Sequence, residues 1–563
     1  MNIFNAHWIP KDLSLPLTQL ELIERHLPSV SLPNPSLPSI DSTWSNLLIQ
    51  GDNLPVLNTL QAHFMKKIKF VYIDPPYFVG TNEVMHIPIT VYRPDSVSPP
   101  PLQKLVYQNT LNESDPVSAF CKWFYQRLQL IKSLICDDGF IATRFDYHYS
   151  HYVKILLDNI FGSQNFINEF IIRRMKKNLS KKQVRNQNHV IVHSDSIFLY
   201  QLSNKSTIHT PITKVKRKNA QPAEIANHWD NIWVDIPGYE KSKKTLYPTE
   251  NSEILLKRLI SLCTTAGDLL ADFFCGSGTT VAVAERLDRR WIGVDLSQYS
   301  LYEIRKRLLH NGLKHPLALY RLIYKEESKK KNLPISSPAL NFKICDKSIL
   351  QAFGGVPLKE SSPFQGKKDE NYIYIGKHEQ VISETDIESL NRFLKQEKDP
   401  EAELIILGWK FRFDLPFFIN LHQKTKHKIY LIRIHKSPNT YSFNPLPSID
   451  IRWKVISESY QVHLSINSYY LSDEETNSLN LPQTPHSLDF IDYWAVNWDS
   501  EHKKTVDWYS FRKLGSGRKI VRGINRETAW RYSKAGKYTI LINIVDIVGN
   551  DLHFTIYFEF QKD

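Results

Sequence analysis

Four consecutive residues, Asp74-Pro75-Pro76-Tyr77, follow a strand-like run at 69–73 and combine a carboxylate, two prolines and an aromatic ring. Prolines fix φ and lack an N–H group, so this turn presents bare carbonyl oxygens beside the Asp74 carboxylate. Such acceptors can hold the N–H groups of a flat, weakly nucleophilic amine against an electrophile, and the Tyr77 ring offers a stacking face. A turn of this type also occurs as simple punctuation after a strand, so its chemical meaning depends on a second motif.

The second motif is a glycine turn between a strand and a helix. Residues 269–274 read as a buried strand, Cys275-Gly-Ser-Gly-Thr-Thr280 follows, and 281–287 is a helical run. In this architecture the backbone approaches a nucleotide-like ligand at a helix N-terminus. Residues 290–295 are expected to form the neighbouring parallel strand. Asp295 at its end is placed to bind the hydroxyl pair of a ribose. The two motifs together indicate a nucleotide-like cofactor beside an amine-binding turn.

With these motifs in this order, residues 47–309 resemble the permuted group of DNA amino-methyltransferases, in which the target-base motif precedes the cofactor motif. The resemblance is strongest to the modification subunits of type III restriction systems and their stand-alone relatives. It implies a Rossmann-like α/β fold, S-adenosyl-L-methionine (SAM) as cofactor and no metal ion. It assigns catalysis to Asp74, Pro75, Pro76 and Tyr77. It assigns cofactor binding to Asp52, Tyr247, Pro248, Thr249, Asp272, Phe273, Phe274, Cys275, Gly276, Gly278, Thr279, Thr280 and Asp295.

Two departures from the family pattern stand out. The family usually has Gln-Lys-Pro after the Pro-Thr pair, where this chain has Glu250-Asn251-Ser252. The Asn-Thr pair expected after the catalytic tyrosine is replaced by Phe78-Val79. Neither change removes a catalytic group, but the first bears on how the chain closes over the cofactor and the second on the surroundings of the target base.

The implied reaction is methyl transfer to the N6 amine of adenine in DNA. That amine is a poor nucleophile, and hydrogen bonds to Asp74 and the Pro75 carbonyl would draw its nitrogen toward tetrahedral geometry. Positioning and electrostatic preorganisation would supply most of the acceleration. The base must leave the duplex stack to be reached. The alternatives are methylation of the N4 amine of cytosine or of an RNA base, and a catalytically silent SAM-fold protein that only binds DNA.

Composition and charge set outer bounds on this interpretation. The 563 residues are too many for one core, so two to four domains are expected. A net charge of +13 suits a polyanionic partner such as double-stranded DNA. The five cysteines show no paired spacing, which favours a reducing compartment and argues against zinc. No signal-like start and no long apolar run is present, so we expect a cytoplasmic protein without a membrane segment.

A basic stretch between the two motifs is the predicted DNA contact. Basic clusters beside aromatic residues suit phosphate contact. The residues assigned to DNA binding are Arg173, Arg174, Lys176, Lys177, Lys181 and Lys182. A restriction or helicase subunit as a further partner, and a homodimer, are left open.

The domain organisation follows from shifts in pattern along the chain. We expect an irregular N-terminal segment, a methyltransferase domain, a linker, a small α/β domain with a docking or scaffold role, and a C-terminal β-sandwich resembling immunoglobulin or PKD modules. The expected bounds are 1–40, 41–315 with a target-recognition insert near 165–245, 316–340, 341–465 and 466–563.

Overall fold

The computed structural model divides the chain into two compact units. The first comprises Met1–Ile87 and Gln103–Glu327, and the second comprises Pro88–Leu102 and Ser328–Asp563. The structure describes residues 18–27, 44–77, 83–87, 102–107, 115–173, 194–209, 212–215, 223–226, 230–236, 250–324, 345–358, 363–369, 371–377, 381–382, 384–394, 403–408, 410–411, 429–437, 440–445, 448–470, 488–499, 505–514, 520–522, 524–547 and 551–560.

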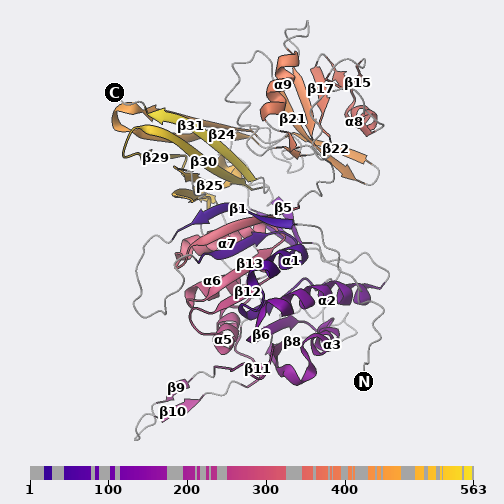
Figure 1. The fold of residues 1–563 in the computed structure, drawn as a ribbon, viewed down its shortest axis with the longest axis vertical. Helices are drawn as coiled ribbons and strands as arrows, with labels where there is room; N and C mark the ends of the chain where they lie inside the picture. The colour runs from indigo at the N-terminus through magenta and orange to yellow at the C-terminus, as the bar shows by residue number, and fades with distance from the viewer. Residues whose placement is uncertain are drawn as a thin grey trace, which may run out of the picture. The chain divides into compact units, whose positions relative to one another are not determined.

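A ten-stranded sheet forms the centre of the first unit, in the order β1-β14-β2-β13-β12-β3-β6-β8-β7-β11 (Figure 1). Its strands are β1 (Thr18–His26), β2 (Asn46–Gln50), β3 (Ile68–Ile73), β6 (Ile135–Phe145), β7 (Phe166–Arg173), β8 (Ser194–Gln201), β11 (Ile232–Trp233), β12 (Leu269–Asp272), β13 (Arg290–Asp295) and β14 (Leu317–Tyr324). The strands from β14 to β6 are mutually parallel, whereas β8 runs antiparallel to both β6 and β7. This is the doubly wound α/β fold with a permuted motif order that the sequence predicts.

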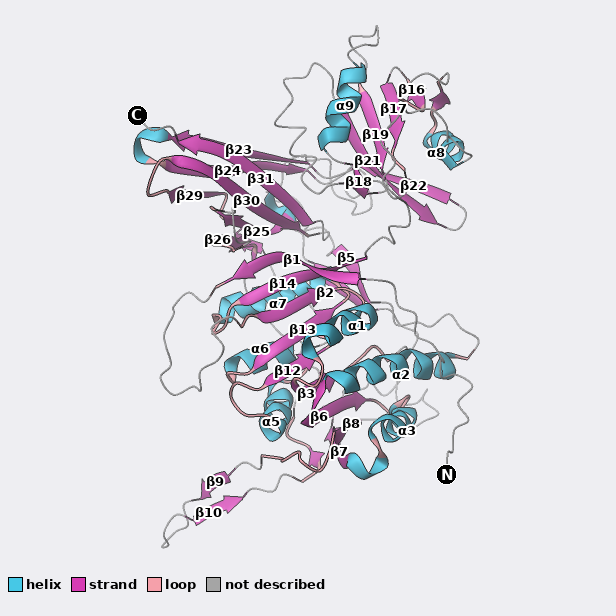
Figure 2. Ribbon diagram, in the orientation of Figure 1, coloured by secondary structure: helices cyan, strands magenta, loops and turns pink. Residues whose placement is uncertain are grey.

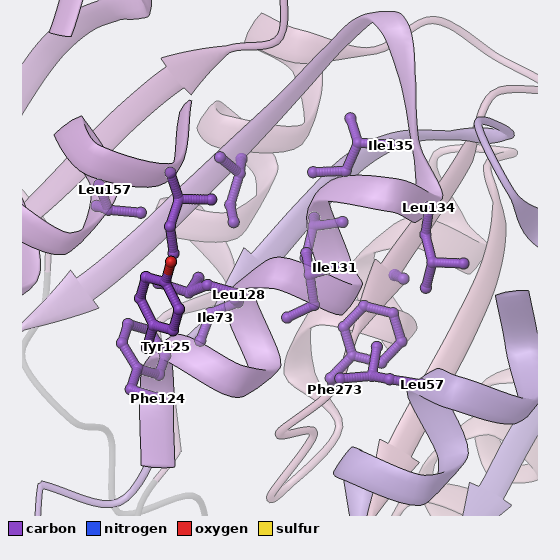
Figure 3. Close-up of a cluster of buried hydrophobic side chains, with 14 of the residues drawn as sticks. Leu57, Ile73, Phe124, Tyr125, Leu128, Ile131, Leu134, Ile135, Leu157 and Phe273 are labelled. Carbon is purple, nitrogen blue, oxygen red and sulfur yellow. The ribbon is translucent and has the colours of Figure 1, made fainter. Parts of the chain in front are cut away.

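Helices cover both faces of this sheet. They are α1 (Asn53–Phe64), α2 (Pro116–Leu134), α3 (Ser150–Phe161), α5 (Glu253–Cys263), α6 (Thr279–Arg286) and α7 (Gln298–Asn311). On one face, α1, α2 and α3 lie side by side and share a core with alternate residues of β3, such as Val71 and Ile73 (Figures 2 and 3). On the other face, α5, α6 and α7 pack against Phe70 and Tyr72. Because β3 is covered on both sides, its residues 70–73 are all apolar rather than alternating.

The first unit extends further at both ends than the sequence predicts. The segment 1–40 was expected to be irregular, but β1 lies within it and pairs antiparallel with β14. The predicted linker 316–340 likewise contains β14, which pairs with β2 as a regular sheet strand. The predicted boundary at 315 is therefore too early. Polar and apolar residues are mixed in both strands and their pairing is long-range, so hydrophobic periodicity did not reveal them.

The second unit contains an α/β layer with a six-stranded sheet in the order β15-β16-β17-β19-β21-β22. Its elements are α8 (Cys345–Phe353), β15 (Val356–Pro357), β16 (Gly366–Lys368), β17 (Asn371–Ile375), α9 (Glu384–Leu394), β19 (Leu404–Gly408), β21 (Ile429–Ser437) and β22 (Thr440–Pro445). The parallel strands β17, β19 and β21 carry its core, as the alternation of strand and helix signals predicts.

The same unit also contains two antiparallel sheets, in the orders β23-β24-β29 and β26-β25-β30-β31. Their strands are β23 (Ser448–Ile456), β24 (Gln461–Tyr470), β25 (Ile491–Asn497), β26 (Trp508–Phe511), β29 (Glu527–Arg531), β30 (Gly536–Asp546) and β31 (Asp551–Phe560). The Tyr469 hydroxyl of β24 donates to Asp546 of β30 at 2.5 Å, which joins the two sheets into the predicted β-sandwich. The predicted boundary at 465 divides β24, so this sandwich begins earlier, at β23.

Eight shorter strands form separate two-stranded pairs or ribbons. They are β4 (Glu83–Ile87), β5 (Leu102–Tyr107), β9 (Ile212–Val215), β10 (Ala223–Ala226), β18 (Val381–Ile382), β20 (Lys410–Phe411), β27 (Lys513–Leu514) and β28 (Ile520–Arg522). Within the described residues, no helix is both long and apolar enough to cross a membrane.

Candidate active site

The two sequence motifs meet because their strands are neighbours. In the parallel pairing of β3 with β12, Asp272 lies opposite Tyr72. Asp74 follows Tyr72 by two residues and therefore lies just beyond the level of Asp272. In the pairing of β12 with β13, Asp272 lies opposite Gly293, and Asp295 ends that strand. All three carboxylates therefore reach the same carboxyl edge of the sheet, which is where ligands bind in open α/β folds.

The glycine turn is shaped by two residues with positive φ. Gly276 has φ +50° and Gly278 has φ +73°, a region that favours glycine. A Cβ added at Gly278 would lie 2.4 Å from Cγ1 of Ile304 on α7, so only glycine lets this turn pack against that helix. The turn consequently brings the N-terminus of α6 directly up to the end of β12.

Asp295 is held against this turn by backbone hydrogen bonds. Its Oδ2 accepts from the Gly276 N–H at 2.7 Å, and its Oδ1 accepts from the Ser297 N–H at 2.8 Å. Ser300 of α7 donates to the Gly276 carbonyl at 2.5 Å and fixes the turn from the other side. An acid beside a glycine turn offers the acceptor set that ribose hydroxyls need, so these residues fit the adenosine part of the implied cofactor.

Two acids of this edge are hard to ionise. Burial raises the pKa of Asp272 to about 7, against hydrogen bonds from Thr280 and the Phe274 N–H that lower it. Burial likewise raises the pKa of Asp295 to about 6, opposed by the Ser297 and Gly276 N–H groups. In the folded chain these two acids therefore take up protons at higher pH than a free aspartate does.

Asp52 occupies the N-cap of α1 at the end of β2. Its Oδ1 accepts from the Leu54 N–H at 3.0 Å and from Nη2 of Arg127 at 3.0 Å. The Arg127 guanidinium also lies over the Trp123 ring, 4.2 Å from its centroid. The side chain of Asp52 is 45% exposed, so it faces solvent at the same edge as the glycine turn.

Arg127 also connects this acid to the strand that carries the glycine turn. Its Nε donates to the Asn53 Oδ1 at 2.6 Å, and the Asn53 amide donates to the Phe273 carbonyl at 2.9 Å. The Phe274 ring in turn packs 5.7 Å from the Trp123 ring. The predicted cofactor residues Asp52, Phe273 and Phe274 are therefore brought together by residues of α1 and α2.

The Asp74 carboxylate makes two close hydrogen bonds. The Tyr77 hydroxyl donates to its Oδ1 at 2.6 Å, and the Asn251 amide donates to its Oδ2 at 2.9 Å. Nη1 of Arg144 lies 3.9 Å from the same Oδ2. Burial raises the pKa of Asp74 above its usual value, while Arg144, Tyr77 and Asn251 oppose that shift. The Tyr77 ring packs 5.6 Å from the Phe145 ring, so the turn is fixed at both ends of the tyrosine.

The next predicted residues divide into three groups. Cys275 is buried in the glycine turn, and Thr279 and Thr280 are buried at the start of α6, where the Thr279 hydroxyl meets that of Ser277 at 3.0 Å. Arg173 lies exposed at the end of β7. The other predictions lie outside the described residues: Tyr247, Pro248, Thr249, Arg174, Lys176, Lys177, Lys181 and Lys182.

Four polar residues near the site were not predicted from the sequence: Arg127, Arg144, Asp195 and Asn251. Arg144 had a signal that could have been used, because it is the charged residue in the largely apolar second half of β6, residues 140–145. A charged residue within a buried strand requires a partner and often marks a functional region. Asp195 and Asn251 are far from Arg144 in the sequence and could not have been linked to it without the fold.

Comparison with known proteins places this region in a family. Residues 68–306 match the family model described as DNA methylase, which covers N6 and N4 amino-methylases. The chain is 25% identical to the type II methyltransferase M.EcaI of Enterobacter cloacae, over 46% of this chain and 69% of that protein. It is 27% identical to the Mod subunit of the type III restriction-modification enzyme EcoP15I of Escherichia coli, over 29% of this chain and 25% of that protein.

Among solved structures, one similar chain is a putative DNA modification methylase of Thermus thermophilus complexed with SAM. It is 18% identical, covers 49% of this chain and 97% of its own, and has a TM-score of 0.31. The family resemblance that the motifs indicated is confirmed: residues 68–306 match the DNA methylase family model. The match to the Mod subunit spans a quarter of that protein, so what the whole of it does is not carried over to this chain.

The raised pKa of Asp272 predicts a pH-dependent stability. Between about pH 4 and about pH 7 the folded chain retains a proton that the unfolded chain has lost, so stability falls as pH rises through this window. The difference between about 7 and the ordinary 3.8 corresponds to roughly 4 kcal/mol. Asp272→Asn should flatten this fall, measured as the free energy of unfolding by urea at several pH values. Asp137→Asn, which changes an exposed acid, is the matched control, and a native-like pH profile in Asp272→Asn would contradict the assignment.

Proposed function

We propose that the first unit binds SAM and transfers its methyl group to the N6 amine of an adenine swung out of double-stranded DNA, within a restriction-modification or phage-defence system. The observation that carries the proposal is the pairing of β3 with β12, which sets the Asp74 turn directly beside the glycine turn. The DNA methylase match of residues 68–306 supports the reaction type, and the curated relatives support the system.

The chain's own residues would divide the work at one sheet edge. Asp295 at the end of β13 and Asp52 just beyond the end of the neighbouring strand β2 would orient the nucleoside part of the cofactor. When bound, SAM supplies an electrophilic methyl group on a positively charged sulfur. That cation would lower the raised pKa values of Asp272 and Asp295, because a nearby positive charge favours the ionised carboxylate.

Asp74 would act on the target base. An ionised carboxylate accepts hydrogen bonds only, so it can hold an N–H of the adenine amine and expose the nitrogen lone pair. The Pro75 carbonyl would accept the second N–H, and the Tyr77 ring would stack on the flipped base, a contact worth about 1–3 kcal/mol. The carboxylate at the first position of the turn favours adenine over cytosine.

The reaction product tests this proposal most simply. Incubation of DNA with methyl-labelled SAM should yield labelled N6-methyladenine after hydrolysis to nucleosides, and Asp74→Asn should lower the rate by about 100-fold or more because it removes the charged acceptor. Labelled N4-methylcytosine would contradict the adenine assignment. Full activity of Asp74→Asn would contradict the catalytic role of the turn.

The cofactor site makes a separate prediction about affinity. Asp295→Ala removes the carboxylate at the end of β13 and should weaken SAM binding by about 1.5–3 kcal/mol, the worth of hydrogen bonds to a charged group. Isothermal titration calorimetry measures this directly. Asp288→Ala, which removes an acid that pairs with Lys314 outside the site, should bind SAM as the native chain does. Equal affinity in both variants would move the ribose site elsewhere.

The basic stretch that begins at Arg173 is proposed to contact DNA phosphates. Replacing Arg173, Lys176 and Lys177 with alanine should reduce the slope of log Kd against log salt by about 3, one for each lost phosphate contact. Fluorescence anisotropy at several salt concentrations measures the slope. The control is Lys314→Ala, a lysine already paired with Asp288 at 2.7 Å. A slope unchanged by the triple variant would locate DNA binding in another part of the chain.

A further inference from the structure

A buried arginine lies behind the catalytic turn. Arg144, near the end of β6, is 2% exposed, and its neighbours in the second half of that strand are mostly apolar. A buried cation is costly unless it is paired and hydrogen-bonded. Its partner is Asp195 on the adjacent strand β8, whose Oδ2 accepts from Nε at 3.1 Å and from Nη2 at 2.6 Å. The side chain of Asp195 is fully buried, so the pair is shielded from solvent.

The third nitrogen of the guanidinium is directed toward the catalytic side. Nη1 of Arg144 donates to Oδ1 of Asn251 and lies 3.9 Å from Oδ2 of Asp74. The Asn251 amide donates through Nδ2 to that same Asp74 oxygen at 2.9 Å. The amide therefore has a defined orientation, because flipping it would set its N–H groups against Arg144 and its oxygen against Asp74.

The segment that carries Asn251 is anchored on the cofactor side. Arg307 of α7 binds the preceding Glu250 at 2.6 Å, and its Nη1 also donates to the Thr279 hydroxyl at 3.1 Å. Glu250 is buried and Arg307 nearly so. Two of the three residues that depart from the family pattern in this segment, Glu250 and Asn251, thus each have an arginine partner. Through these partners the segment is held between α7 and β6.

We propose that Arg144, held by Asp195, is a positioning residue for Asp74: together with Asn251 it fixes the orientation of the catalytic carboxylate, and its charge favours the ionised form. This inference rests on the proposed function and deepens it. A protonated Asp74 would itself be a donor and could not accept from the amine. The Arg144 cation lies beside Asp74 and opposes the effect of burial on that acid.

The groups that face Asp74 come from every neighbouring element. Tyr77 belongs to its own turn, Arg144 to β6, Asp195 to β8 and Asn251 to the segment before α5, while Asp272 on β12 interacts with it electrostatically. Of these groups, Arg144 alone carries a positive charge. Its loss should therefore raise the pH at which Asp74 becomes ionised, and so move the acidic limb of the kcat profile to higher pH.

The test removes the pair together, because Arg144→Met alone would leave Asp195 buried without its counter-ion. In the variant Arg144→Met/Asp195→Asn we expect kcat to fall about 100-fold through misplacement of the carboxylate. We expect KM for SAM to change little and the acidic limb of kcat to move to higher pH. Arg144→Lys keeps the charge and should leave the acidic limb of the kcat profile near its native position, although lysine cannot bind Asp195 and Asn251 together as the guanidinium does. Native kcat and a native pH profile in the double variant would overturn the inference.

The matched control is a second buried pair of the same unit. Arg305 of α7 binds Glu24 of β1 at 2.5 Å, and the two side chains are 7% and 0% exposed. Arg305→Met/Glu24→Gln should lower the melting temperature as the Arg144 variant does, yet keep the native pH profile. The same pH shift in both variants would mean that loss of any buried pair produces it, and would also overturn the inference.

A structural measurement separates this inference from the proposed function. A crystal structure of Arg144→Met/Asp195→Asn should show Asn251 released from Asp74 and the carboxylate in another rotamer. An unchanged Asp74–Asn251 contact would overturn the inference. If the native protein methylates no DNA, the proposed function fails, and the crystal structure still decides whether Arg144 positions Asp74.

Discussion

The parallel register of β3 against β12 is the constraint on which the rest of the site depends. It aligns Asp272 with Tyr72, so the two turns that follow these strands leave the sheet side by side. A slip by one residue would turn every side chain of β3 to the opposite face and exchange Val71 and Ile73 for Phe70 and Tyr72 in the two cores. Both faces are closed by helices, so such a slip would disrupt packing on both sides at once. The hydrophobic cores therefore fix the distance between the catalytic turn and the glycine turn.

This register gathers acids at one edge, and the fold manages their charge in different ways. Burial raises the pKa of Asp272 to about 7 and that of Asp295 to about 6, and hydrogen bonds from backbone N–H groups and hydroxyls oppose both shifts. Asp74 instead has a guanidinium nearby and an amide between the two. Burial raises the pKa of all three acids. At Asp74 the Arg144 guanidinium opposes that shift, whereas at Asp272 and Asp295 hydrogen bonds oppose it.

Much of this could be predicted from the sequence, for physical reasons. The glycine turn has positive φ at Gly276 and Gly278, and the Asp74 turn contains two prolines. Both motifs consist of consecutive residues, so they can be recognised in the sequence. The parallel strands β3 and β12 carry consecutive apolar residues, 70–73 and 269–271, because helices cover both faces. These features predict the α/β class and the candidate catalytic and cofactor turns from the sequence alone. The strands β1 and β14 were missed because their pairing is long-range and their composition is mixed.

The contacts around Asn251 could not be predicted in the same way. Each depends on residues that meet only in the fold: Arg144 with Asp195, Glu250 with Arg307 and Asn251 with Asp74. In the sequence, the Glu250-Asn251-Ser252 segment reads only as a departure from a family pattern. In the structure Glu250 binds Arg307, and Asn251 binds Arg144 and Asp74. The residues that differ from the family pattern therefore anchor the segment through contacts of their own.

The account is tested most directly by a crystal structure of the protein with a non-reactive SAM analogue and a DNA duplex. We predict the analogue's ribose against Asp295, and a purine outside the duplex with its exocyclic nitrogen within hydrogen-bonding distance of Asp74. An analogue bound away from the glycine turn, or a target base that does not reach Asp74, would contradict the central claim.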